Sequence, residues 1–200
     1  MFREILAYCS LAVGMVSPIP YVIGTIRGGV RPHRITWLLF LLLNINFLIS
    51  AIVTHGNLWF TVGQLAGPLV IFALSIRYGV GGKSPFDIAA LSFAAVAFGL
   101  LMMIDDKIFG LILTLLIDMA AGALTVKKVI KDRASESKLT WGLGALSGLL
   151  GLISLVNYSV ENVLFPLWIL LFTTFMFFAA KPPAPGSTPT LCSTPRKQPK

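Results

Sequence analysis

The chain has 200 residues, of which 56% are hydrophobic and 12% are charged. This balance excludes an ordinary soluble domain, in which about a quarter of the residues are charged, and favours a protein that lies in lipid. A bilayer span needs roughly 20 mostly apolar residues. Runs of this kind occur at 5–26, 36–54, 58–76, 86–104, 108–126, 139–157 and 163–180.

These seven runs nearly fill the chain, so their connections are short and no soluble domain fits between them. We expect an all-α polytopic membrane protein with seven transmembrane helices, because unsatisfied backbone polar groups are too costly in hydrocarbon. The strand alternation of an outer-membrane barrel is absent from the sequence. We therefore expect membrane lipid to be a partner of the chain.

The net charge of +8 does not indicate nucleic-acid binding, because of where the charges lie. If the connections alternate across the membrane, every Lys and Arg except Arg3 and Lys107 falls on one side. The positive-inside rule then places the N-terminus outside and the C-terminus in the cytoplasm of a cell (plasma or inner) membrane. Residues 181–200 hold six prolines and no apolar run, which predicts a disordered cytoplasmic tail that is solvated or touches anionic lipid or a partner.

An internal repeat is visible when the chain is shifted by 104 residues against itself. Thr36-Trp37 then falls on Thr140-Trp141, and Leu48-Ile49-Ser50 falls on Leu152-Ile153-Ser154, without a gap. The basic residues of the intervening loop keep their spacing as well. We interpret 1–80 and 107–180 as two parallel three-helix repeats joined by a linker helix at 81–106, a 3+1+3 arrangement.

This layout, with a proline-bearing first helix in the triplet, resembles the PQ-loop superfamily, which includes the SWEET transporters and cystinosin. The stretch PHRITW and the run from Asp118 to Trp141 are similar to a group of bacterial seven-helix proteins related to that superfamily. The resemblance covers about residues 5–180. It implies two three-helix bundles that face each other around a central path.

Pro18 and Pro20 interrupt the first apolar run and predict a kinked helix. In the resembling transporters, such kinks are hinges that open the path alternately to each side; a fixed kink that fits neighbouring helices is the alternative. Neither proline is followed by glutamine. The second repeat has Gly122 where the first has Pro18, and this glycine provides either flexibility or close packing.

Asp118 is an acidic residue near the middle of a predicted span. A carboxylate there costs about 2.5–3.5 kcal/mol to insert, so it should face a cavity or a partner. The resemblance to cystinosin-like proteins implies proton coupling at this position. A polar contact to substrate and a hydrogen bond that caps a neighbouring helix are the alternatives.

Several further residues are candidates for a substrate path. Gln64 and Gly67 keep the spacing of an asparagine motif that lines the sugar pocket in SWEET proteins, although the second repeat has Trp168 instead of an amide. Trp168 and Trp59 would supply apolar or stacking walls. Asn44 and Asn46 point about 200° apart on one helix, so we expect one to line the path and the other to bond a neighbour.

The basic loop side offers a candidate cytoplasmic gate of Arg31 and Arg34 paired to Glu136. The two arginines are topology signals first and gate candidates second, and solvation is the default for a loop glutamate. Trp37 and Trp141 begin their spans beside basic residues, a position typical of interfacial anchors.

No enzyme motif, metal site or cofactor motif is evident in the sequence. His33 and His55 fall on opposite membrane sides, and Cys9 and Cys192 differ too much in setting to suggest a disulfide. We therefore expect a SWEET-like transporter of a small polar solute that works by alternating access, coupled to protons through Asp118. The alternative is a non-transporting receptor or scaffold on the same fold. Two triplets in one chain make a complete pathway within a monomer, and a homo-oligomer remains open.

Overall fold

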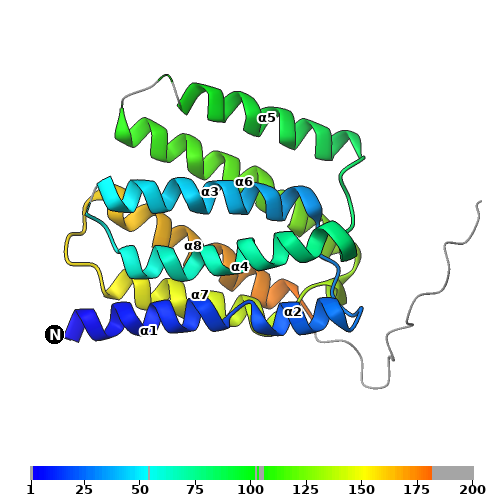
Figure 1. The fold of residues 1–200 in the computed structure, drawn as a ribbon, viewed down its shortest axis with the longest axis horizontal. Helices are drawn as coiled ribbons and strands as arrows, with labels where there is room; N and C mark the ends of the chain where they lie inside the picture. Colours follow the sequence, from blue (N-terminus) through cyan, green and yellow to red (C-terminus); the bar gives the residue numbers. More distant parts are fainter. Residues whose placement is uncertain (1, 54, 102, 104–105, 182–200) are drawn as a thin grey trace, which may run out of the picture.

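The structure, a computed structural model, describes residues 2–53, 55–101, 103 and 106–181. The predicted tail lies outside the described residues, apart from Lys181. The helices run side by side, roughly along one direction (Figure 1), and the all-α prediction is confirmed. Their bounds are α1 (Phe2–Val16), α2 (Ile19–Ile26), α3 (Arg34–Val53), α4 (Leu58–Tyr78), α5 (Pro85–Leu101), α6 (Lys107–Lys131), the short 3₁₀ turn η1 (Arg133–Ser135), α7 (Lys138–Ile153) and α8 (Val160–Ala179).

Five of these helical segments are long and apolar enough to cross a membrane. They are Phe2–Ile26, Arg34–Val53, Leu58–Tyr78, Ile108–Lys131 and Val160–Ala179. α5 and α7 are apolar but shorter, with 17 and 16 residues. For these two segments, membrane crossing stays a prediction.

The surface of the bundle is apolar and part of its interior is polar. Ile76, Val96 and Phe178 are each at least 65% exposed, whereas Ser10, Thr36 and Ser147 are fully buried. A water-soluble protein rarely leaves so many large apolar side chains in solvent. This reversed distribution fits a bundle whose outer surface contacts lipid acyl chains.

The first predicted span is broken between α1 and α2, at Ser17 and Pro18. Pro18 has no N–H to donate to the carbonyl of Gly14, four residues earlier. The hydroxyl of Ser17 donates to that carbonyl instead, at 2.9 Å. The predicted kink is therefore present, and its freed carbonyl is satisfied locally. Pro20 is the second residue of α2, where a missing N–H is tolerated.

Side chains at the helix starts fix the connections. Asn57 accepts from the backbone N–H of Phe60 at the start of α4, and Asp106 accepts from that of Phe109 at the start of α6. These caps satisfy N–H groups that a helix start leaves without partners. The C-terminal end of α7 is at Ile153, where the hydroxyl of Ser154 donates to the carbonyl of Gly151. The predicted span 139–157 is therefore too long.

The helix–helix contacts close a ring, in the order α1/α2, α4, α3, α6, α8 and α7. α5 lies outside this ring, beside α6 (Figure 1). α4 packs between α1/α2 and α3, and α8 packs between α6 and α7. The two sets meet where α1 contacts α7 and where α3 contacts α6. In each set the third helix along the chain contacts both others, which is the packing that two equivalent triplets require. The 3+1+3 repeat itself stays a prediction.

Candidate functional site

A cavity lies at the centre of the ring. The empty space between its lining atoms is about 600 Å³, including open solvent at its edges. Its lining residues are Ser17 and Pro18 at the α1–α2 break, Trp37, Phe40 and Asn44 of α3, Gln64, Gly67, Pro68 and Ile71 of α4, Asp118 of α6, Thr140, Trp141 and Gly144 of α7, and Ile169, Phe172 and Thr173 of α8.

Asp118 lines this cavity and is 4% exposed. The indole N–H of Trp168, on α8, donates to its Oδ2 atom. Among the described residues, this is the one hydrogen bond of the carboxylate, and no Lys, Arg or His lines the cavity. Asp118 thus faces both an aromatic donor and the cavity, and it does not cap a neighbouring helix.

The two asparagines of α3 point to different surroundings. Asn44 lines the cavity, where its amide nitrogen donates to the carbonyl of Phe40 at 2.8 Å. Its Oδ1 atom is buried and has no hydrogen-bond partner. Asn46 donates to the hydroxyl of Thr114 on α6, at 2.9 Å. A buried acceptor without a partner is uncommon in a stable fold, which marks Asn44 as a ligand contact candidate.

Gln64 both lines the cavity and bonds a neighbouring helix. Its amide nitrogen donates to the hydroxyl of Ser147 on α7, at 3.0 Å. That hydroxyl donates to the carbonyl of Ser10 on α1, at 2.9 Å. Gln64 therefore fits both predicted alternatives: it lines the cavity and it forms an interhelical hydrogen bond.

An aromatic layer separates the cavity from the end of the bundle that carries Arg31, Arg34 and Lys128, here called the basic end. The indoles of Trp37 and Trp141 stack with their centroids 6.4 Å apart, and both side chains are 5% exposed. Trp37 donates to the hydroxyl of Tyr21, at 3.3 Å. The prediction that these tryptophans are interfacial anchors is wrong, because each is buried in the ring and lines the cavity.

Glu136 lies buried behind this layer. Its carboxylate accepts from the Tyr21 hydroxyl and the Trp141 indole, each at 3.1 Å, and forms an ion pair with Lys128. The expectation of a solvated loop glutamate is wrong, since Glu136 is 2% exposed. The fold buries this carboxylate because a cation and two donors replace its hydration.

The predicted pairing of Glu136 with arginine is also not observed. Arg31 is exposed, and its backbone carbonyl accepts from the Lys128 ammonium. Arg34 donates to the carbonyl of Ser75 on α4, at 3.0 Å. Lys128 therefore takes the place that the sequence analysis gave to the arginines. Its ammonium connects the loop before α3 to the loop before α7.

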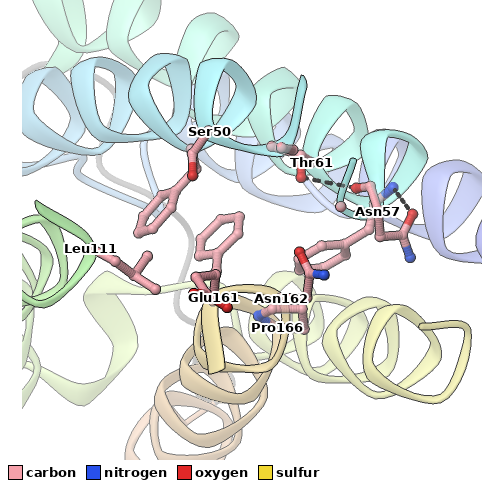
Figure 2. Close-up of a pocket in the computed structure, with 12 residues that line it drawn as sticks. Ser50, Asn57, Thr61, Leu111, Glu161, Asn162 and Pro166 are labelled. Atoms are coloured by element: carbon pink, nitrogen blue, oxygen red, sulfur yellow. Dashed lines mark hydrogen bonds between the residues drawn. The ribbon is translucent and has the colours of Figure 1, made fainter. Parts of the chain in front are cut away.

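Three phenylalanines lie about one helical turn beyond the cavity-lining residues Asn44, Gln64 and Ile169, and line a neighbouring pocket. The rings of Phe47 and Phe165 stack with centroids 3.7 Å apart, and Phe60 lies 5.4 Å from Phe165. This second pocket is also lined by Asn57 at the start of α4 and by Glu161 and Asn162 at the start of α8 (Figure 2). The central cavity thus lies between two aromatic layers, the tryptophans at one end and the phenylalanines at the other.

Other predicted site residues are not brought to the cavity. Trp59 is 44% exposed and packs on Tyr8, in a depression outside the phenylalanine layer. Gly122 belongs to a continuous α6, and a Cβ atom there would lie 2.8 Å from the Phe172 ring. This favours close packing over flexibility at Gly122. Pro20 is half-buried and does not line the cavity.

A buried contact between a histidine and a carboxylate, which sequence reasoning missed, connects the linker helix to the ring. His33 Nε2 lies 3.2 Å from Asp87 Oδ1, at the basic end of the bundle. Burial lowers the pKa of His33 below its usual 6.5; the carboxylate of Asp87 opposes this effect, and Lys128 adds to it. Gly81, with φ of +82°, packs against the imidazole. The pair anchors α5 to the loop that precedes α3.

The repeat held a signal for part of the missed site. Trp37 and Trp141 occupy equivalent places in the two halves, as Gln64 and Trp168 do. In the predicted parallel repeat, aligned positions of the two halves would approach the same central axis, which made the tryptophan pair a candidate for the cavity wall. No comparable signal marks Phe172 or Thr173 in the sequence.

Comparison with known proteins adds no relative: no family model, no curated protein and no solved structure matches the chain. Within the described residues, no group of three or more His, Cys, Asp or Glu side chains is arranged to hold a metal ion.

Proposed function

We propose that the protein transports a small polar solute across the membrane by alternating access, with the central cavity as its binding site. One observation carries this proposal: Asp118, Asn44 and Gln64, from three different helices, line one buried cavity between the two helix triplets. A site at the junction of two helix bundles is exposed to either side when the bundles rock against each other.

The two aromatic layers support this proposal. Trp37 and Trp141 close the cavity toward the basic end, and Phe47, Phe60 and Phe165 close it toward the other end. A transporter must never open both ends at once, and a state closed at both ends is an intermediate of such a cycle. We infer that each layer is a gate, with Glu136 and Lys128 holding the basic one.

Prolines beside the cavity provide places where helices can bend. Pro18 lies at the break between α1 and α2, and Pro68 lies inside α4. Both line the cavity, and the Cβ of a residue at Gly67 would be 3.8 Å from the Pro18 ring. Bending at these two prolines would move α2 and the C-terminal half of α4. The hydrogen bonds of α1 and of the N-terminal half of α4 would stay intact.

Proton coupling is the proposed role of Asp118. The carboxylate faces the cavity with one described donor and no basic lining residue, so its charge must be neutralised by a proton or by the solute. If Asp118 binds either a proton or the solute but not both, the flux of protons is coupled to the flux of the solute.

Reconstitution into liposomes tests the proposal. Uptake of radiolabelled sugars, amino acids, amines and organic acids is measured with and without a pH gradient, beside protein-free vesicles. We expect uptake of at least one class, increased by a gradient and insensitive to it in Asp118→Asn. Solute-dependent thermal stabilisation without uptake in any vesicle would favour the receptor alternative instead.

A further inference from the structure

We propose that the central cavity selects a small organic cation with an apolar body, such as an aromatic amine, over sugars and organic acids. This inference names the substrate class and rests on the proposed transport function.

The charge of the lining is the first support. Asp118 is the one titratable side chain among the described residues that line the cavity. Lys128 is paired to Glu136 behind the tryptophan layer, so its ammonium is not available to a solute there. An anion in this cavity would face a carboxylate in a low-dielectric setting with no compensating cation, which is strongly unfavourable. A cation would instead neutralise Asp118.

The hydrogen-bonding groups support the same class. The indole N–H groups of Trp37, Trp141 and Trp168 all donate within the protein. The hydroxyls of Thr140 and Thr173 also donate within the protein, to Ser137 Oγ and to the Ile169 carbonyl. The amide nitrogens of Asn44 and Gln64 each donate one hydrogen bond, which leaves one further N–H on each, so the lining has few free donors.

What faces the cavity is mainly acceptor capacity. The Asp118 carboxylate has one described donor, and the buried Oδ1 of Asn44 has none. An ammonium group has three donors and no acceptor, so it matches this surface. A sugar presents hydroxyls that need donors as well as acceptors.

Aromatic rings form the rest of the wall. Phe172 packs on Trp141 with centroids 5.7 Å apart, and Phe40 packs on Trp37 at 5.6 Å; all four rings line the cavity. Indole and phenyl faces attract cations, and they also cover an apolar body. The combination of one carboxylate with several aromatic faces is what a hydrophobic ammonium ion requires.

Three probes of matched shape test the inference: phenethylamine, 2-phenylethanol and 3-phenylpropionate share a phenylethyl body and differ in the charge of the end group. Binding to the full-length protein in lipid nanodiscs is measured by calorimetry and by tryptophan fluorescence, against empty nanodiscs. We expect phenethylamine to bind at least about tenfold more tightly than either analogue, a difference of about 1.4 kcal/mol. Equal binding of all three, preference for the anion or alcohol, or no binding at all would overturn the inference.

Two variants sharpen this test. Asp118→Asn removes the charge at nearly constant shape and should abolish the preference for phenethylamine. Glu4→Gln, which neutralises an exposed carboxylate at the start of α1, is the matched control and should preserve it. Retention of the preference in a folded Asp118→Asn would contradict the inference. If that variant does not fold, the probe series on the unmodified protein decides.

The outcome is separable from that of the transport proposal. Selective binding of phenethylamine without uptake into liposomes would leave the cation site standing and remove transport. Uptake of a sugar or an organic acid together with weak phenethylamine binding would leave transport standing and remove the cation selectivity.

Discussion

Trp168 on α8 donates its indole N–H to the carboxylate of Asp118 on α6. Trp168 lies 104 residues after Gln64, so the predicted repeat aligns the two residues. Gln64 donates to Ser147 on α7 instead. The aligned residues therefore connect different pairs of helices: Gln64 joins α4 to α7, and Trp168 joins α8 to α6.

We expect Trp168→Phe to impair the site. Phenylalanine keeps an aromatic wall but has no N–H, so the buried Asp118 carboxylate loses its described donor. Such a loss costs about 1–3 kcal/mol. The variant should melt at a lower temperature and show uptake reduced by about tenfold. Trp59→Phe, at an exposed position off the cavity, is the control, and equal effects of the two changes would contradict this role.

Pro18→Ala tests the hinge. Alanine restores an N–H that can bond the Gly14 carbonyl, so α1 and α2 should join into a straighter and stiffer helix. We expect thermal stability to hold or rise while the rate of uptake falls by about tenfold. Pro20→Ala, at the second residue of α2, should leave uptake nearly unchanged. Unchanged uptake in a folded Pro18→Ala would leave the kink as a fixed packing feature.

The ion pair of Lys128 with Glu136 should stabilise the closed basic end. Lys128→Met leaves a buried carboxylate without its cation, which costs about 3–5 kcal/mol. Adding Glu136→Gln removes the uncompensated charge, so the double variant should be more stable than Lys128→Met. Thermal unfolding in detergent measures both. Lys131→Met removes an exposed charge from the same helix and should have little effect; a cost as large as that of Lys128→Met would argue against the pair.

The buried His33 predicts a pH dependence of stability. Its pKa in the folded protein is lowered below 6.5 by burial, so the unfolded chain binds more protons near that pH. Stability should therefore rise from about pH 5 to about pH 7. His33→Gln should flatten this rise, whereas His55→Gln, at an exposed site, should not. Stability curves that are parallel for His33→Gln and the unmodified protein would contradict this account.

Helix content and the broken first helix followed from the sequence. Both depend on local properties: apolar runs favour helices in lipid, and a proline removes one backbone donor wherever it lies. The prediction that Asp118 meets a cavity or partner has the same basis, because an exposed carboxylate in acyl chains is too costly. The structure places Asp118 against Trp168 and the cavity.

The tertiary structure decided which residues surround that carboxylate and which partners other charges have. From the sequence alone, Trp37 and Trp141 could lie at a membrane interface or in a core. Contact between their indoles across the ring, from α3 and α7, makes them cavity walls. Glu136 pairs with Lys128 and not with the arginines, because the last turn of α6 brings that ammonium beneath the loop. Local patterns set which segments are helical; distances between side chains far apart in the chain are set by how the helices pack, and these determine the site.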